Sequence, residues 1–258
     1  MDPLRGALAA LVTGIAAALV IVALAILPFL NPVWVSFAQE RAQAEAWTGF
    51  TTEQLAAVTN PILLDLVLGP PDFDVTLDGV TVLNDNERGH MRDVRGVFFG
   101  FFVVAIAAAV VLALMFLVAR GSAARARFWK RLERTGIVIV AVTVVGGMLG
   151  LLFFDSAFIL FHEIFFPGGN YLFDPGTDRL VQLFPQQFWV DSAIGVGVVV
   201  IVLALAMSWV ARRRARTLAA RGVPGAQPRQ PAAPALPSDG PAEPAAPAEP
   251  TDVPAEPR

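Results

Sequence analysis

Long apolar runs alternate with polar stretches along this chain, and four of the runs are long enough to cross a membrane. They cover residues 7–30, 97–119, 136–161 and 192–211. An α-helix rises about 1.5 Å per residue, so roughly 20 apolar residues cross about 30 Å of hydrocarbon. The pattern predicts an all-α integral membrane protein with four transmembrane helices. The first run lacks the short apolar core and small-residue cleavage site of a signal peptide, so we expect it to be retained as a span.

Positive charge is concentrated in two places along the chain. The connection over residues 120–135 carries a cluster of Lys and Arg, and four Arg follow the fourth run at 212–216. Short basic segments next to membrane helices stay in the cytoplasm. Both termini are therefore expected to be cytoplasmic, and the connections 31–96 and 162–191 are expected on the outer face.

The connection 31–96 is long enough to form a small extracytoplasmic cap. Thr51–Gln54 is typical of a capped helix start, because Ser or Thr followed three residues later by Glu or Gln satisfies two free backbone N–H groups. Pro61 suits the first turn of a second short helix over 62–68. We therefore expect two short helices in this part of the cap.

A β-hairpin is predicted later in the same connection. Asp78-Gly79 separates the β-rich runs 75–77 and 80–83, and both turn positions of such a hairpin require positive φ. From Glu87 onward the chain is expected to enter the second span as a helix. Residues 222–258 are rich in Pro and Ala and are predicted to be a disordered cytoplasmic tail.

The composition supports a membrane protein that handles lipid. Hydrophobic residues make up 55% of the chain and charged residues 16%, against about a quarter charged in soluble domains. The absence of Cys excludes disulfides, thiolate nucleophiles and Cys-ligated metals. The chain has nineteen Phe and five Trp but one Tyr, a set suited to acyl chains. This set makes membrane lipids the expected partners. No nucleic-acid motif is present, so no nucleic-acid partner is expected.

The only two histidines, His90 and His162, are the first candidates for chemistry. Each lies where a long apolar segment meets an outer polar loop, so both are expected on the same membrane face at similar depth. On a helix, Glu87 shares a face with His90, and Asp93 lies one turn after it. Asp155 lies two turns before His162 on the same helical face. This arrangement predicts two imidazoles with carboxylates nearby.

The supporting residues are Glu87, Asp93, Asp155 and Glu163, the last being adjacent to His162. A carboxylate beside an imidazole fixes its tautomer, and an ionisable group within a membrane helix is a functional candidate by default. The alternative is purely structural: these residues form solvated helix ends and mark the edge of the hydrocarbon.

Two other types of site fit the sequence less well. Two imidazoles and a carboxylate can hold Zn²⁺, but no H-E-x-x-H or similar spacing occurs, so no metal or other cofactor is expected. A serine nucleophile would be Ser36, Ser156 or Ser192, and none lies in a nucleophile-elbow motif. The expected depth of the histidines favours acyl transfer instead, because the ester bonds of a diacylglyceryl group lie at that boundary. Acyl transfer needs a base and hydrogen-bond donors for a developing oxyanion.

Three segments together resemble the signature of the lipoprotein intramolecular transacylase (Lit)-like family of four-helix bacterial membrane proteins. They are Glu87–Val94, Phe161–Phe166 and Phe173–Pro185. The resemblance extends over about residues 7–211. It implies a bacterial cell-membrane enzyme that moves the sn-2 acyl chain of a lipoprotein's diacylglyceryl-cysteine onto that cysteine's own α-amino group. The family's essential histidine pair matches His90 and His162.

In the mechanism that this resemblance suggests, His162 takes the proton from the attacking amine. His90, oriented by Glu87 or Asp93, polarises the ester or passes the proton on. The candidates for substrate contact are Arg92, Arg95, Tyr171, Asp174 and Asp178. The chain departs from the family pattern at Tyr171, where Trp is expected, and at Gln186, where Glu is expected.

Two further functions stay open on the sequence. A non-enzymatic chaperone or scaffold for envelope proteins would need an apolar outer pocket but not the two imidazoles. A lipid hydrolase would use the same pair to activate water. For the transacylase, the expected partners are membrane lipids and the diacylated N-terminus of a lipoprotein.

Overall fold

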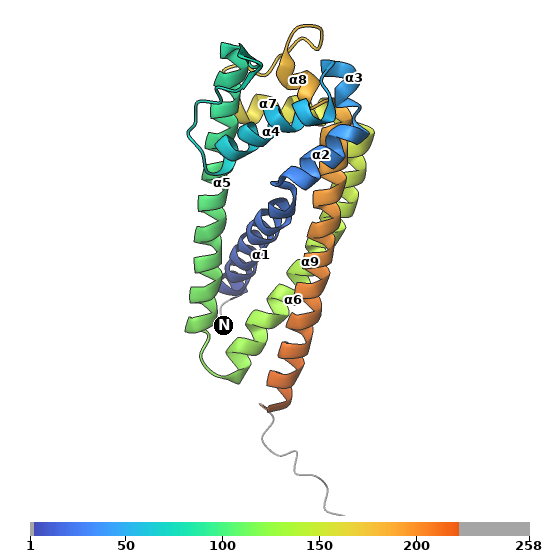
Figure 1. Ribbon diagram of the computed structural model, residues 1–258. Helices are drawn as coiled ribbons and strands as arrows, with labels where there is room; N and C mark the ends of the chain where they lie inside the picture. The colour runs from blue at the N-terminus through green and yellow to red at the C-terminus, as the bar shows by residue number, and fades with distance from the viewer. Residues whose placement is uncertain (1–2, 222–258) are drawn as a thin grey trace, which may run out of the picture. The chain divides into compact units, whose positions relative to one another are not determined.

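Four long helices form a bundle, and shorter helices gather at one end of it (Figure 1). The computed structural model describes residues 3–221, so the predicted tail over 222–258 lies outside the described residues. The long helices are α1 (Pro3–Ile26), α5 (Asp85–Val118), α6 (Ser122–Leu152) and α9 (Gln186–Arg221). Each contains a segment long and apolar enough to cross a membrane. The predicted number of spans is therefore confirmed for the described residues.

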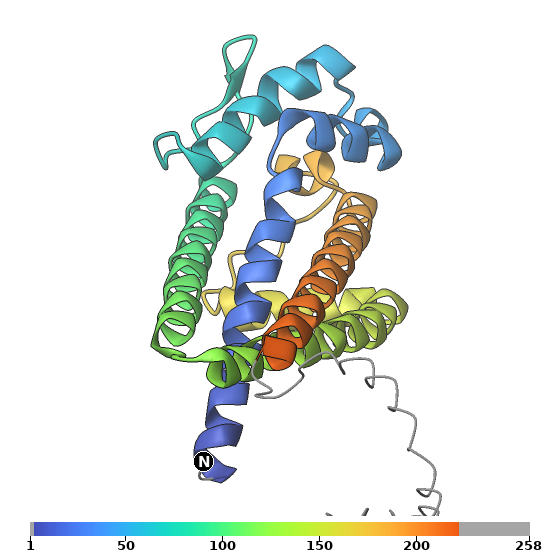
Figure 2. The same cartoon turned by 90° about the horizontal axis from the view of Figure 1, so that it is seen from below.

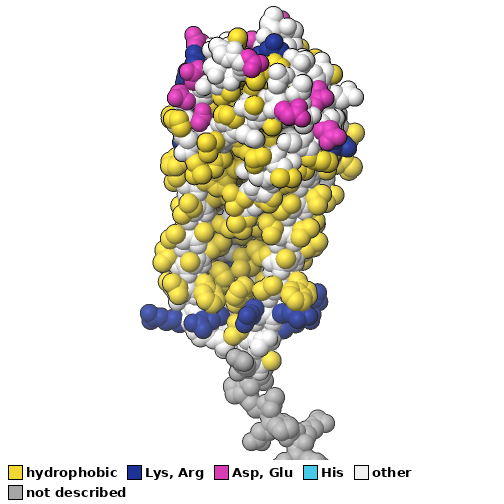
Figure 3. Space-filling model, in the orientation of Figure 1, with side chains coloured by type: hydrophobic (Ala, Val, Ile, Leu, Met, Phe, Trp, Pro, Cys, Tyr) yellow, Lys and Arg dark blue, Asp and Glu magenta, His cyan; other side chains and the backbone are white. Residues whose placement is uncertain are grey.

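The side chains divide the visible surface into three zones (Figure 3). A broad apolar belt covers the long helices, Lys and Arg gather at one end, and most Asp and Glu lie at the other end with the short helices. Highly exposed residues of the belt include Leu8, Ile106, Val142 and Val198. An exposed apolar surface of this extent is typical of contact with lipid.

The bundle is held together by small residues. α6 packs along α9, and α1 contacts both of them as well as α5 (Figure 2). A Cβ atom added at Gly136 of α6 would lie 2.6 Å from the carbonyl oxygen of Ala204 in α9. Nearby, Ser208 Oγ donates a hydrogen bond to the carbonyl oxygen of Glu133 at 3.0 Å. Close backbone approach and interhelical hydrogen bonds are the usual means of helix association in lipid, where apolar burial gives little driving force.

The third apolar run differs from its prediction, because the expected single helix over 136–161 is divided in two. α6 ends at Leu152, and α7 (Phe154–Phe165) starts after Phe153, whose φ of −121° and ψ of 40° are not helical. α7 then runs across the end of the bundle (Figure 1). Glycine is a weak helix former and occurs three times shortly before the break, at 146, 147 and 150. Asp155 falls in the first turn of α7, where the helix dipole favours negative charge.

Most of the short elements form a cap on the bundle. It contains α2 (Pro32–Arg41), α3 (Ala44–Thr48), α4 (Thr52–Val67), α8 (Arg179–Leu183) and a small hairpin, and the 3₁₀ turn Leu27–Phe29 leads into it from α1. Its buried core includes Val58, Ile62, Phe73, Leu83 and Leu183. Met91 belongs to the same core, so the charged first turns of α5, residues 85–96, are part of the cap. The apolar remainder of α5 is its membrane-spanning part.

The helix start at Thr51 is confirmed, but the second short helix is not separate. The Thr51 side chain accepts from the N–H of Gln54 at 3.3 Å, and Gln54 Oε1 accepts from the N–H of Thr51 at 3.0 Å. α4 then continues through Pro61 to Val67, so the expected break before residue 62 is wrong. Pro61 removes one helical hydrogen bond, but Ile62 beside it is buried in the cap core. Tertiary packing outweighs the local preference at this position.

The predicted hairpin is present but short. β1 (Thr76–Leu77) pairs antiparallel with β2 (Val80–Thr81). Asp78 and Gly79 adopt φ values of 52° and 79°, as the turn requires. The hairpin leads directly to the N-terminus of α5, near which His90 lies.

Candidate active site

Glu87 fixes the start of α5, from which His90 projects one turn later. The Glu87 side chain is almost fully buried. Its Oε2 atom accepts from the backbone N–H of Asn84 at 2.7 Å, which closes a capping box on α5. Its Oε1 atom accepts from the backbone N–H of Leu180 at 2.5 Å. Glu87 therefore joins α5 to α8 and uses both oxygens on backbone groups, and it does not act as the direct hydrogen-bond partner of His90.

His162 lies near the C-terminal end of α7, and its ring orientation is fixed by the backbone of the same helix. Its Nδ1 atom lies 2.7 Å from the carbonyl oxygen of Phe158. A carbonyl oxygen only accepts hydrogen bonds, so Nδ1 carries the hydrogen and Nε2 keeps its lone pair when the ring is neutral. This is the tautomer that a general base at Nε2 requires.

The structure brings the two histidines together. The ring centroids of His90 and His162 lie 5.9 Å apart, and the ring planes differ by 21°. The two residues are only 6% and 8% exposed. The pair forms because α7 crosses the end of the bundle and reaches the first turns of α5.

Aromatic rings enclose the pair. The closest ring centroids around His90 are those of Phe166 at 4.8 Å and Phe173 at 5.4 Å. Those around His162 are Phe158 at 4.1 Å and Tyr171 at 5.0 Å. Such surroundings exclude water and strengthen the interaction of an imidazole with a developing charge. Phe166 and Phe173 belong to the segments that carry the family resemblance, whereas nothing in the sequence distinguishes Phe158 among the nineteen Phe of the chain.

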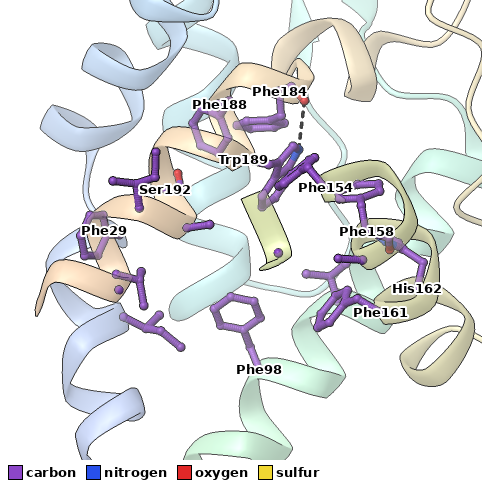
Figure 4. Close-up of a pocket in the computed structure, with 18 of the residues that line it drawn as sticks. Phe29, Phe98, Phe154, Phe158, Phe161, His162, Phe184, Phe188, Trp189 and Ser192 are labelled. Atoms are coloured by element: carbon purple, nitrogen blue, oxygen red, sulfur yellow. Dashed lines mark hydrogen bonds between the residues drawn. The ribbon is translucent and has the colours of Figure 1, made fainter. Parts of the chain in front are cut away.

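A large apolar cavity lies beside the histidines (Figure 4). It has a volume of about 1510 Å³, and its lining comes from all four long helices, α7 and the cap. Ordinary small-ligand pockets measure about 300–1,000 Å³. Figure 4 shows Phe98, Phe161, Trp189 and His162 around this space, with Trp189 Nε1 donating to the carbonyl oxygen of Phe184 at 3.0 Å. The size and lining of the cavity suit acyl chains.

Asp93 approaches His90 through Asn170, a residue that sequence analysis missed. Asn170 Nδ2 donates a hydrogen bond to Asp93 Oδ2 at 2.7 Å. The amide lies close enough to interact with the His90 ring. Within residues 3–221, however, neither His90 Nδ1 nor Asn170 Oδ1 has a hydrogen-bond partner. The only sequence signal for Asn170 is its place beside Tyr171, between the two matching segments.

The two remaining carboxylates predicted to support the histidines lie elsewhere. Asp155 Oδ1 accepts from Gln186 Nε2 at 2.7 Å, and Glu163 is exposed. Asp155 shares a helical face with His162, but two turns of helix separate them by about 10 Å. Within the described part of the chain, neither carboxylate is hydrogen-bonded to His162.

Arg95, one of the two arginines predicted to contact substrate, makes hydrogen bonds within the protein instead. Arg95 Nη1 donates to the carbonyl oxygens of Asp65 and Gly69, the latter at 2.8 Å, at the C-terminal end of α4. It satisfies carbonyl groups that the helix end leaves without partners. Arg92 is exposed on α5 and stays a candidate for substrate contact.

The loop before α8 contains the other three candidates for substrate contact. Asp178 Oδ2 accepts from the N–H of Asp174 at 2.7 Å, and Asp178 Oδ1 accepts from Asn84 Nδ2 at 2.9 Å. The Asp174 carboxylate accepts from the N–H of Gly176 at 2.8 Å, so both carboxylates organise the loop, and Asp178 joins it to the start of α5. Tyr171 instead lies against His162 and lines the cavity, so it stays a candidate for substrate contact.

The alternative metal and serine sites are not assembled in residues 3–221. No group of three or more His, Asp or Glu side chains there is placed to hold a metal ion. Ser192 Oγ accepts from Trp34 Nε1 at 3.1 Å, while Ser36 and Ser156 are exposed. None of these serines is hydrogen-bonded to a histidine in the same residues.

Comparisons with known proteins agree with this architecture. The family model described as "Lipoprotein intramolecular transacylase Lit" matches residues 11–189. The solved structure of the membrane integral lipoprotein intramolecular transacylase Lit from Bacillus cereus aligns with a TM-score of 0.67 and 19% identity, covering 85% of this chain and 98% of that chain. A histidine-to-arginine variant of that protein aligns with a TM-score of 0.67 and 17% identity, covering 85% and 96%. A comparison with curated proteins found no match. At these identities the likeness to solved structures shows a shared fold.

Proposed function

Because this chain belongs to the family of the lipoprotein intramolecular transacylase Lit, we propose that it transfers an acyl chain within the N-terminal cysteine of a lipoprotein. The acyl chain moves from the diacylglyceryl group to the cysteine's own α-amino group. The observation that carries the proposal is the pairing of His90 and His162, with ring centroids 5.9 Å apart, on the wall of a large apolar cavity. The acyl chains occupy the cavity, which holds the ester beside the two imidazoles.

The tautomer of His162 supports a role as the base. Its Nδ1–H is held by the Phe158 carbonyl, so Nε2 accepts the proton of the attacking amine as the nitrogen bonds to the ester carbonyl carbon. His90 in its protonated form donates a hydrogen bond to the carbonyl oxygen, which gains negative charge. When the intermediate collapses, the bond from this carbon to the glyceryl oxygen breaks, and the proton on His162 passes to that oxygen. The products are an amide and a free hydroxyl, with no net change in protons.

The charge distribution supports a location and an orientation for this site. Short basic segments next to membrane helices stay in the cytoplasm, and Lys and Arg gather at the end of the bundle away from the cap (Figure 3). We place both termini in the cytoplasm of a bacterial cell and the histidines on the extracytoplasmic side. A diacylated lipoprotein and membrane lipids can then reach the site from the outer leaflet.

The test is acyl transfer on a diacylated lipopeptide in membranes, followed by mass spectrometry. Transfer leaves the total mass unchanged but moves one acyl group onto the N-terminal fragment ions. His90→Ala and His162→Ala should each reduce the rate by about 10²- to 10⁴-fold, the usual effect of losing a general acid or base. Burial and the nearby His162 lower the pKa of His90, so activity should fall as the pH rises and His90 loses the proton that this mechanism requires.

Ser156→Ala is the matched control, because Ser156 is an exposed residue on the same helix as His162. It should keep full activity, and all variants should unfold at similar temperatures. Full transfer by both histidine variants would refute the two-histidine mechanism. Release of free fatty acid without N-acyl product would indicate a lipid hydrolase, and no reaction of the native protein would favour a chaperone or scaffold. Inhibition by a chelator would point to a metal site.

A further inference from the structure

Asn170 lies between a carboxylate and one of the two histidines. It belongs to the loop that follows α7, just after Gly169, whose φ of 73° turns the chain. Its Nδ2 atom donates to Asp93 Oδ2 at 2.7 Å. Its Oδ1 atom is buried and has no hydrogen-bond partner among residues 3–221, and the same is true of His90 Nδ1. Buried polar atoms are rarely left unpaired in proteins, so two of them next to the same reaction site require an explanation.

The contact with Asp93 determines which way the Asn170 amide faces. An ionised carboxylate only accepts hydrogen bonds, so the NH₂ group of Asn170 must point to Asp93. The amide oxygen then faces away from Asp93, where the side chain interacts with the His90 ring. An amide oxygen only accepts, so the His90 nitrogen that pairs with it must carry a hydrogen.

We propose that Asn170 is a positioning residue for His90: its Oδ1 accepts the Nδ1–H of the imidazole while Asp93 holds the amide in place. This contact satisfies both unpaired atoms and leaves His90 Nε2 as the reactive nitrogen. His162 presents Nε2 through its own bond to the Phe158 carbonyl. The two histidines thus have the same tautomer, set in one case by a helix backbone and in the other by Asn170.

The same contact helps His90 to carry a second proton. Burial, and next the charge of the nearby His162, lower the pKa of His90, while Asn170 and the Asp93 carboxylate behind it act in the opposite direction. The hydrogen bond from an imidazolium N–H to the Asn170 oxygen is charge-assisted, and Asp93 polarises the amide in the favourable direction. Asn170 therefore supports the protonated His90 of the proposed mechanism.

The direct test is the tautomer of His90, measured by solid-state NMR of the full-length protein in lipid bilayers with ¹⁵N-labelled histidine. The chain has only two histidines, so the spectrum contains two imidazoles, which His162→Ala assigns. At a pH where the rings are neutral, native His90 should show a protonated Nδ1 and an unprotonated Nε2. Asn170→Ala should give a mixture of tautomers at His90 and leave the His162 signals unchanged. The His162 signals thus serve as an internal control for folding.

A pair of exchanged substitutions tests the same contact through activity, and only this second test rests on the proposed function. Asn170→Asp places two carboxylates together and should reduce acyl transfer by about 10- to 100-fold, as is usual for losing the partner of a functional histidine. Adding Asp93→Asn restores the order of donors and acceptors, because the new carboxylate accepts from both His90 Nδ1–H and the new amide. The double variant should recover most of the activity. The control is Asn60→Ala, an exposed position on α4 outside the site.

The results separate this inference from the proposed function. If Asn170→Ala keeps His90 fully protonated on Nδ1, or if the double variant is no more active than Asn170→Asp alone, Asn170 does not position His90. If the native protein transfers no acyl chain, the proposed function fails, while the NMR spectrum still decides the role of Asn170.

Discussion

Replacing Glu87 tests whether this buried carboxylate holds the site together through the backbone. Glu87→Ala removes both of its hydrogen bonds, one to the N–H of Leu180 and one to the N–H of Asn84. Leu180 is 7% exposed, so its N–H is left without water or another partner, whereas Asn84 is exposed and can bond to solvent. The loss at Leu180 should therefore dominate.

The size of the effect follows from these two contacts. A hydrogen bond to a charged group contributes about 1.5–3 kcal/mol, and an N-terminal capping interaction contributes about 1 kcal/mol. Removing the carboxylate also removes the cost of burying it, which offsets part of the loss. We expect Glu87→Ala to destabilise the protein by about 2–3 kcal/mol and to lower acyl transfer, because α8 and the loop before it loosen next to His90.

The assay is thermal unfolding in detergent, followed by Trp fluorescence, together with acyl transfer at several pH values. Asp85→Ala is the matched control: Asp85 lies in the same helical turn but pairs with Arg88 at the exposed surface, where an ion pair contributes little. Glu87→Ala should lower the unfolding temperature clearly, while Asp85→Ala should not. An unchanged unfolding temperature with an altered pH profile of activity would refute this reasoning, because it would mean that Glu87 acts on the protonation of His90.

Two further predictions concern the bundle and its orientation. Gly136→Ala should lower the unfolding temperature, because its Cβ would meet the Ala204 carbonyl oxygen. Gly146→Ala is the control, because a Cβ there has open space on the same helix, and it should leave the unfolding temperature unchanged. Equal unfolding temperatures for the two variants would mean that α6 and α9 do not pack closely at Gly136. The native chain has no cysteine, so single cysteines at Thr177 and Ala123 can be labelled separately. An impermeant thiol reagent should label Thr177→Cys in intact cells and leave Ala123→Cys unlabelled, and the opposite result would reverse the proposed orientation.

Features encoded by near neighbours could be predicted from the sequence. The number of spans follows from apolar runs of about 20 residues, since the cost of exposing polar groups to lipid leaves few alternatives. The helix start at Thr51 and the turn at Asp78-Gly79 depend on side chains and φ values within four residues. The positions of His90 and His162 at the ends of apolar runs likewise required no knowledge of the fold. These are local properties, and the chain carries them directly.

The assembly of the site depended on tertiary structure. The break at Phe153 turns α7 across the bundle, and this turn brings His162 to His90 from 72 residues away. The observed partners of the carboxylates differ from the predicted ones for the same reason. A charged side chain bonds to the groups that the fold places within about 3 Å, and helical spacing does not specify those groups. Glu87 therefore accepts from a backbone N–H of α8, and Asp93 accepts from Asn170. The sequence by itself determined which residues carry the chemistry of the proposed reaction, and the tertiary structure decided how they are oriented, because orientation depends on contacts between segments that are distant along the chain.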